Sequence, residues 1–160
     1  MSIVRFLLLL SLVIWVGGIA FFAFVLAPTV FHPGILPSRQ LAGAVVSRSL
    51  SILHWMGLGC GVVFLVTSIA EAQITTGYAA VFTARNLLVC AMIVLTLISM
   101  FAISTRMLAL RNDMVFIDNI PHDDTRRVEF NRLHVWSTRL ESTVFLLGLA
   151  VIFLTARRLS

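Results

Sequence analysis

The sequence predicts an all-α fold: an integral membrane four-helix bundle with up-down topology. Three observations support this prediction. The first two are that 59% of the 160 residues are hydrophobic and that only 12% are charged, whereas soluble domains carry about 25% charged residues. The third observation is that the apolar residues form four long runs, and a helix of roughly 20 residues crosses a bilayer. We therefore expect a single domain over residues 1–160, with the lipid bilayer as its main partner.

The four runs predict helices at about residues 4–31, 39–72, 84–110 and 124–157. Three of them contain a stretch without any charged residue: Phe6–Phe31, Ser49–Ala70 and Asn86–Thr105. Strands of membrane barrels alternate apolar and polar residues over about 10 residues, whereas these runs are apolar on all sides. Helices are therefore the predicted form of every span.

The first two runs carry local signals for their ends. Arg5 precedes an apolar stretch that resembles a signal peptide, but the stretch continues through Ala27, beyond the usual 7–15 residues, so an uncleaved span is expected. Pro28 lacks a backbone donor and should kink the first helix or begin its exit. Ser38 is expected to cap the second helix, which then begins at Arg39.

The closest helix packing is expected between the first and second helices. Small residues let two backbones approach each other in lipid, and the second helix carries two glycines four residues apart. The expected packing residues are Trp15, Gly17, Gly18, Pro28, Gly57 and Gly61. A notch that holds a flat ligand such as a porphyrin is the alternative interpretation of these glycines.

The fourth helix differs from the others because it carries Arg139 and Glu141 in its first half. His134, Ser137 (or its neighbour Thr138) and Glu141 share one helical face, and Glu141 should not face lipid. Its expected partner is Arg139, Arg48 or His54. The interpretations left open are a structural ion pair, a proton or ion pathway, and a Glu141 that is kept neutral by desolvation.

His54 and His134 are the candidate metal or cofactor ligands. Both are predicted to lie one to two turns inside the membrane on the same side, and two facing imidazoles suit a haem iron or a copper ion. Hydrogen-bonded interfacial histidines are the alternative. Cys60 and Cys90 have methionines nearby, as Cu(I) sites do, but core filling is the expected role of these sulfur atoms.

Catalytic residues are not predicted, because the chain contains no GxSxG, HExxH or phosphate-loop motif. The net charge of +5 does not indicate a nucleic-acid partner either, since the arginines flank membrane spans. All twelve basic residues are arginine, and eight of them fall in or beside the first and third connections. Positive residues favour the cytoplasmic side, so a bacterial inner-membrane location with both termini outside is expected.

Three segments resemble the bacterial family of domain-of-unknown-function 4149, which is related to the eukaryotic transmembrane-protein-205 group: RFLLLLSLVIWVGGIAFFAFVLAPTVF, SILHWMGLGCGV and FNRLHVWSTRLESTVFLLGL. The resemblance implies a four-helix membrane fold and no established activity. More distantly, the WVGG segment and the histidines resemble copper-resistance D-type proteins and protoporphyrinogen-oxidising haem proteins. Those haem proteins carry a histidine early in the first helix and a basic residue in the third, which are lacking here.

Two classes of function follow. The first is a small-solute or metal-ion transporter, or an accessory membrane subunit, that works as a homo-oligomer because four helices enclose little room; a purely structural role belongs to the same non-enzymatic class. The second is a haem-linked redox protein that uses His54 and His134. In either case the first three helices are expected to be lipid-compatible throughout their spans, and the polar chemistry is expected to be crowded toward one membrane face.

Overall fold

The computed structural model describes residues 2–114, 121 and 124–159, and it contains no strand within them. Its elements are α1 Ser2–Phe21, η1 Phe22–Leu26, α2 Ala27–Val30, α3 Arg39–Thr76, α4 Ala84–Ile98, η2 Ser99–Ser104, α5 Thr105–Asp113 and α6 Thr125–Leu159. Four described segments are long and apolar enough to cross a membrane: Ser2–Val30, Arg39–Thr76, Ala84–Asp113 and Thr125–Arg158. The chain is an all-α, multi-pass membrane protein.

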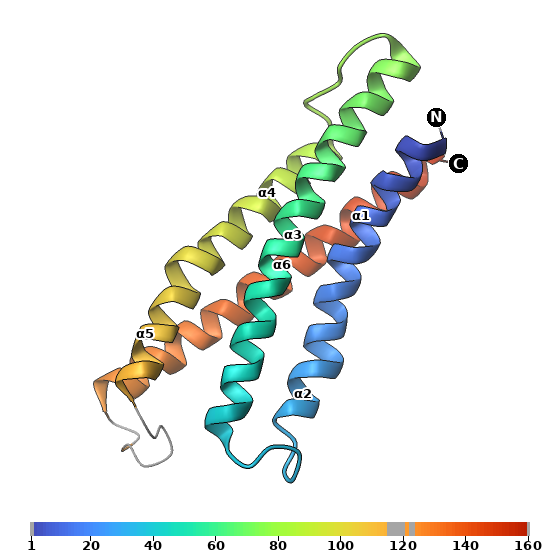
Figure 1. The fold of residues 1–160 in the computed structure, drawn as a ribbon. Helices are drawn as coiled ribbons and strands as arrows, with labels where there is room; N and C mark the ends of the chain where they lie inside the picture. Colours follow the sequence, from blue (N-terminus) through green and yellow to red (C-terminus); the bar gives the residue numbers. More distant parts are fainter. Residues whose placement is uncertain (1, 115–120, 122–123, 160) are drawn as a thin grey trace.

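The helices form an elongated bundle with both termini at one end, close to the turn between α3 and α4 (Figure 1). The turn between α2 and α3 and the start of α6 lie at the other end. The most extensive contact is between α1 and α3, followed by that between α4 and α6. Because α6 crosses the bundle obliquely (Figure 1), it contacts α5 near its start and α1 farther along.

Two of the membrane segments contain a π-helical stretch, η1 and η2. The first one ends just before Pro28, which has no N–H and whose ring would clash with the carbonyl one turn earlier. The turn widens there, so that the Ala27 N–H bonds to the Phe22 carbonyl five residues back. The expected disturbance at Pro28 is therefore a π-helical turn that precedes the proline. Such turns occur often at functional sites.

Several helix ends differ from the expected ones. Ser38 caps α3, accepting a hydrogen bond from the Leu41 N–H at 3.2 Å, but α3 continues to Thr76 instead of residue 72. Gly77 caps its C-terminal end, and the φ of +75° at this residue is a left-handed conformation that suits glycine. At the start of α6, Asp124 accepts hydrogen bonds from the side chain and backbone N–H of Arg126, and these lower its pKa to about 2.

Trp15 fills the space between α1 and α3. A Cβ atom added to Gly57 would overlap the Trp15 indole, and one added to Gly61 would lie 2.9 Å from its Cζ3 atom. Gly18 packs against Leu53 of α3 in the same way. The glycine notch therefore holds an indole ring of the chain itself, not an open slot for a porphyrin.

Gly17 and Pro28, which we expected in this packing, lie at the surface. A Cβ atom added to Gly17 would meet no atom within 4 Å. Only one of the two adjacent glycines can face α3, because consecutive helix positions are 100° apart. Gly18 occupies that position.

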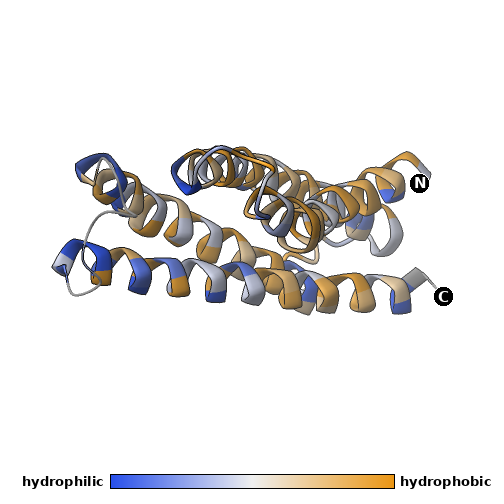
Figure 2. Cartoon of the chain, turned by 90° about the horizontal axis from the view of Figure 1, so that it is seen from below, coloured by the Kyte–Doolittle hydropathy of each residue, from blue (hydrophilic) through white to orange (hydrophobic). Residues whose placement is uncertain are grey.

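The outer surfaces of most helices are apolar, as lipid contact requires. In Figure 2, orange dominates the middle of the helices, while blue residues gather at their ends. The exception is α6, where blue residues recur along the half that is farther from the C-terminus (Figure 2). That half is the polar part of the fourth helix that the sequence indicates.

Gly57→Ala should destabilise the bundle because the new methyl group would meet the Trp15 indole. Overpacking of this kind costs about 1–3 kcal/mol, which a titration with denaturing detergent would measure as a lower free energy of unfolding.

Gly59→Ala is the matched control, since a Cβ atom at Gly59 would meet nothing within 4 Å. Alanine has the higher helix propensity, so this variant should unfold like the wild type or slightly later. Equal stability of the two variants would contradict the packing described for Trp15.

Candidate functional site

One largely buried polar cluster consists of His54 of α3, Ser99 of η2 and Glu141 of α6, whose side chain is 16% exposed, and we call it the His54 cluster. The His54 Nε2 atom lies 2.6 Å from the Glu141 Oε1 atom. The Ser99 hydroxyl donates to the same oxygen at 3.2 Å. His54 is 2% exposed and Ser99 is fully buried. Of the three partners expected for Glu141, the structure places His54 beside it.

The local helix geometry explains why these three residues meet. Ser137, Glu141 and Val144 lie three or four residues apart, so they share the face of α6 that turns toward the bundle, and Ser137 and Val144 are both buried. Ser99 is the first residue of η2, where the helix changes its winding. These elements bring an acid, a hydroxyl and an imidazole together between apolar helices.

The second nitrogen of His54, Nδ1, is buried and has no hydrogen-bond partner within the described part of the chain. An unpaired buried polar atom costs about 1–3 kcal/mol. Such an atom is explained when a proton, a water molecule or a bound solute contacts it. The Nδ1 atom of His54 is therefore a hydrogen-bonding position of the His54 cluster that is left without a partner by the described residues.

His134 does not join this cluster, because it lies exposed on the outer side of α6. His134 lies three residues before Ser137, which places it about 60° around the helix from the buried line through Ser137 and Val144. Arg139 is also exposed, with its guanidinium 5.5 Å from the centre of the Trp136 ring. The two facing imidazoles expected for a haem or copper ion are therefore not brought together.

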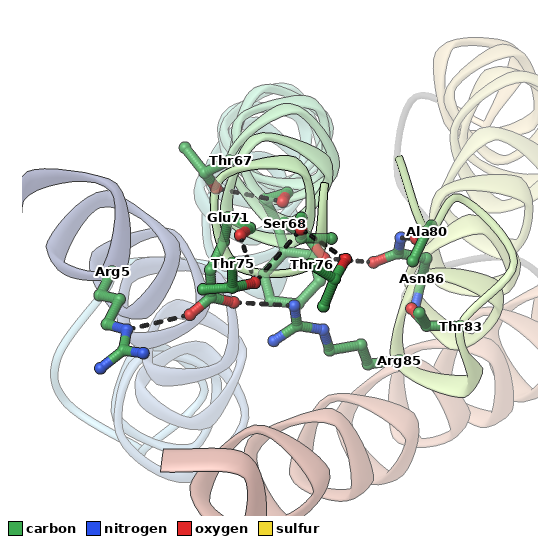
Figure 3. A network of polar contacts seen from close by, with 12 residues as sticks. Arg5, Thr67, Ser68, Glu71, Thr75, Thr76, Ala80, Thr83, Arg85 and Asn86 are labelled. Carbon is green, nitrogen blue, oxygen red and sulfur yellow. Dashed lines mark hydrogen bonds and ion pairs between the residues drawn. The ribbon is translucent and has the colours of Figure 1, made fainter. Parts of the chain in front are cut away.

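A second cluster, which we call the Glu71 cluster, lies in the half of the bundle that holds the termini (Figures 1 and 3). The two carboxylate oxygens of Glu71 on α3 bind different helices. Oε1 accepts from Arg5 Nε of α1 at 3.1 Å, and Oε2 accepts from the guanidinium of Arg85 on α4 at 2.9 Å. Glu71 and Arg85 are 3% and 5% exposed, so this pair is withdrawn from solvent and lipid.

Neutral hydrogen bonds surround the Glu71 cluster and tie α3 to α4. The Ser68 hydroxyl donates to the Asn86 side-chain oxygen at 2.7 Å, and the Asn86 amide donates to the Val81 carbonyl at 3.0 Å. Thr75 and Thr76 donate to carbonyls of the preceding turn of α3. These bonds link the turn to α4 and α4 to α3 beside the buried ion pair.

The Glu71 cluster corrects the expectation that the polar chemistry is crowded toward the membrane face with most of the arginines, because it lies in the half of the bundle that holds the termini. Glu71 directly follows the uncharged stretch of the second predicted helix and is not among the residues expected to carry polar chemistry. Two signals could have revealed it: Ser68, Glu71 and Thr75 share a helical face, and Arg85 lies in the first turn of α4, where the helix dipole disfavours a cation. A cation at that position needs an acid nearby.

The sulfur atoms do not gather into a site. Cys60 is partly buried against the apolar core, whereas Cys90 is exposed, and both are free thiols. Met92 is fully buried in the core, while Met56 lies at the surface. Among the described residues, no group of three or more His, Cys, Asp or Glu side chains is placed to hold a metal ion.

Glu71→Gln should destabilise the protein strongly, because it leaves Arg85 buried without a counter-charge. Removal of one partner from a buried ion pair costs about 3–5 kcal/mol, and the melting temperature in detergent would report it.

Glu129→Gln provides the control, since it makes the same chemical change in the exposed Arg106–Glu129 pair. Exposed pairs contribute little, so its melting temperature should stay close to that of the wild type. If Glu71→Gln melted like Glu129→Gln, the Glu71 cluster would not stabilise the bundle.

The family comparison covers much of the structure just described. The model of the family described as "Domain of unknown function (DUF4149)" matches residues 10–115, which include His54, Glu71, Arg85 and Ser99 but not Glu141. No curated protein and no solved structure matches the chain. The chain belongs to the DUF4149 family of domains of unknown function.

Proposed function

We propose that this chain is a membrane transport protein for a small solute or a metal ion, in which the His54 cluster takes up and releases a proton during transport. One observation carries the proposal: an imidazole and a carboxyl group share a hydrogen bond of 2.6 Å between α3 and α6, within membrane-spanning helices. Ionisable residues inside such helices are costly and generally mark ion pathways or proton relays.

The chemistry of the His54 cluster suits proton exchange without loss of structure. When Glu141 is ionised, the Nε2–H group donates to its Oε1 atom, and Nδ1 then carries the lone pair. A proton that arrives at Nδ1 converts the imidazole into an imidazolium ion, while the bond between Nε2 and Oε1 remains. The unpartnered Nδ1 atom is thus the position at which a proton can be gained or lost.

Ser99 supports the same exchange from a third helix. Its hydroxyl donates to the carboxylate oxygen that His54 also contacts, so Glu141 keeps a hydrogen-bond donor when the imidazole moves. Ser99 begins the π-helical stretch η2, and π-helical turns are frequent at functional sites. A change in the winding of η2 would move the hydroxyl relative to the carboxylate.

A haem-linked redox role has less support from the geometry. His134 is exposed, and the glycine notch that could admit a flat ring is filled by Trp15. The remaining candidate ligand, His54, already uses Nε2 for Glu141. Transport coupled to proton exchange therefore agrees better with the positions of these side chains.

The proposal includes an orientation and an assembly. Both termini face the non-cytoplasmic side of the bacterial inner membrane. The end of the bundle that carries most of the arginines is cytoplasmic, because positive residues favour that side. The core between the helices is filled by large side chains such as Trp15 and Phe64. A solute path is therefore expected between copies of the chain in a homo-oligomer.

Proton flux into proteoliposomes tests this function. Vesicles that contain the purified protein and an internal pH-sensitive dye are given a potassium diffusion potential, and the wild type should acidify them faster than empty vesicles do. Glu141→Gln should reduce the flux to the rate of empty vesicles, because the amide cannot hold the exchangeable pair with His54.

Glu129→Gln serves again as the control, since its carboxylate lies outside the His54 cluster and is paired with Arg106; it should conduct like the wild type. Wild-type vesicles that behave like empty ones would refute proton transport. Undiminished flux in folded Glu141→Gln protein would refute the role given to this pair.

A further inference from the structure

We propose that the outer face of α6 binds the headgroup of an anionic phospholipid. The site is an open groove of about 650 Å³ lined by His134, Val135, Trp136, Thr138, Arg139, Ser142 and Thr143, and we call it the α6 groove. It is separate from the His54 cluster, because its side chains lie on the exposed surface of the helix. Within a membrane, any such surface is covered by lipid or by another protein.

The depth of Arg139 is the first argument. Arg139 precedes Glu141 by two residues, about 3 Å along the helix axis, and Glu141 contacts His54. His54 is six residues, or about 9 Å, beyond Arg48, the last charged residue before the apolar stretch of α3. The backbone of Arg139 therefore lies several ångströms inside the membrane edge, where a lipid-facing cation requires an anion.

The direction of the Arg139 side chain is the second argument. Its guanidinium carbon lies 5.5 Å from the centre of the Trp136 ring, three residues nearer the start of α6. Long basic side chains reach toward the headgroups in this way, and tryptophan is enriched at the same level of the bilayer. The guanidinium is thus presented at the depth of the lipid phosphate groups.

Unused hydrogen-bond donors give the site its chemistry. Among the described residues, Arg139 has no ion pair with an acidic side chain, in contrast to Arg5, Arg85, Arg106 and Arg126. Its planar guanidinium matches two phosphate oxygens at once, and the Ser142 hydroxyl and the His134 ring lie in the same groove. Thr138 and Thr143 instead donate to carbonyls of their own helix.

The rest of the α6 surface suits an acyl chain. Leu146 and Phe153 follow Arg139 at seven and fourteen residues, so they continue the same face toward the bilayer centre. They are 64% and 61% exposed. A phospholipid whose phosphate lies on Arg139 can therefore lay one chain over these two residues.

Charge favours an anionic lipid as the occupant over a second copy of the chain. The same end of the bundle carries several further arginines, and each one near a membrane surface favours anionic lipid. A two-fold contact between two copies through this face would instead bring two Arg139 side chains together, and no acidic residue lines the α6 groove. The occupant is therefore a phospholipid with net negative charge.

Native mass spectrometry of the full-length protein tests the site, with phosphatidylglycerol and phosphatidylcholine of identical acyl chains as competing probes. The wild type should bind phosphatidylglycerol more tightly. Arg139→Gln should reduce this preference about fivefold, as expected for the contribution of one arginine at an anionic surface. Arg139→Lys should retain most of it and thereby separates loss of charge from loss of folding.

Arg48→Gln is the matched control, because it removes one exposed arginine from the same end of the bundle without touching the α6 groove. It should change the preference much less than Arg139→Gln does. Equal loss in both variants would overturn the site in favour of general surface charge. Displacement of the lipid by inorganic phosphate would overturn a lipid site, and a dimer that only Arg139→Gln abolishes would place a second copy in the groove.

Discussion

The constraint on which the bundle depends is that a carboxylate within a membrane helix must find its partners inside the protein. Glu71 meets this constraint by joining α3 to α1 and α4 through Arg5 and Arg85. Glu141 meets it by joining α6 to α3 and η2 through His54 and Ser99. Lipid offers little hydrophobic drive for helix association, so these polar contacts define which helices are neighbours, and the Trp15 packing closes the space between them.

The two clusters differ in the groups that bind their carboxylate oxygens. Both carboxylate oxygens of Glu71 are held by arginines, which remain charged at every physiological pH, so this cluster is a fixed tie between helices. Glu141 is held by a histidine and a serine, and histidine changes its charge in the physiological range. The cluster that we propose to exchange a proton is also the one that borders a π-helical stretch, whereas the Glu71 cluster lies beside the turn between α3 and α4.

The sequence predicts the spans and the close approach of the first two helices, because both depend on local patterns of apolar and small residues. His54 was one of three partners expected for Glu141, since helical spacing defines a face but not the neighbour across it. The Glu71 cluster escaped prediction because its partners Arg5 and Arg85 lie on two other helices, and the sequence does not show which helices pack beside Glu71. His134 was a candidate ligand beside His54, but it lies about 60° around α6 from the buried line through Ser137 and Val144 and is exposed.

Infrared difference spectroscopy of Glu141 tests the central claim most directly, namely that the His54 cluster exchanges a proton inside the bundle. Wild-type protein in lipid, titrated with pH, should gain or lose a carboxylic-acid carbonyl band or an imidazolium band that is missing in Glu141→Gln and altered in His54→Gln. Spectra of the wild type and Glu141→Gln that respond identically to pH would contradict the claim and leave the pair a static link between α3 and α6.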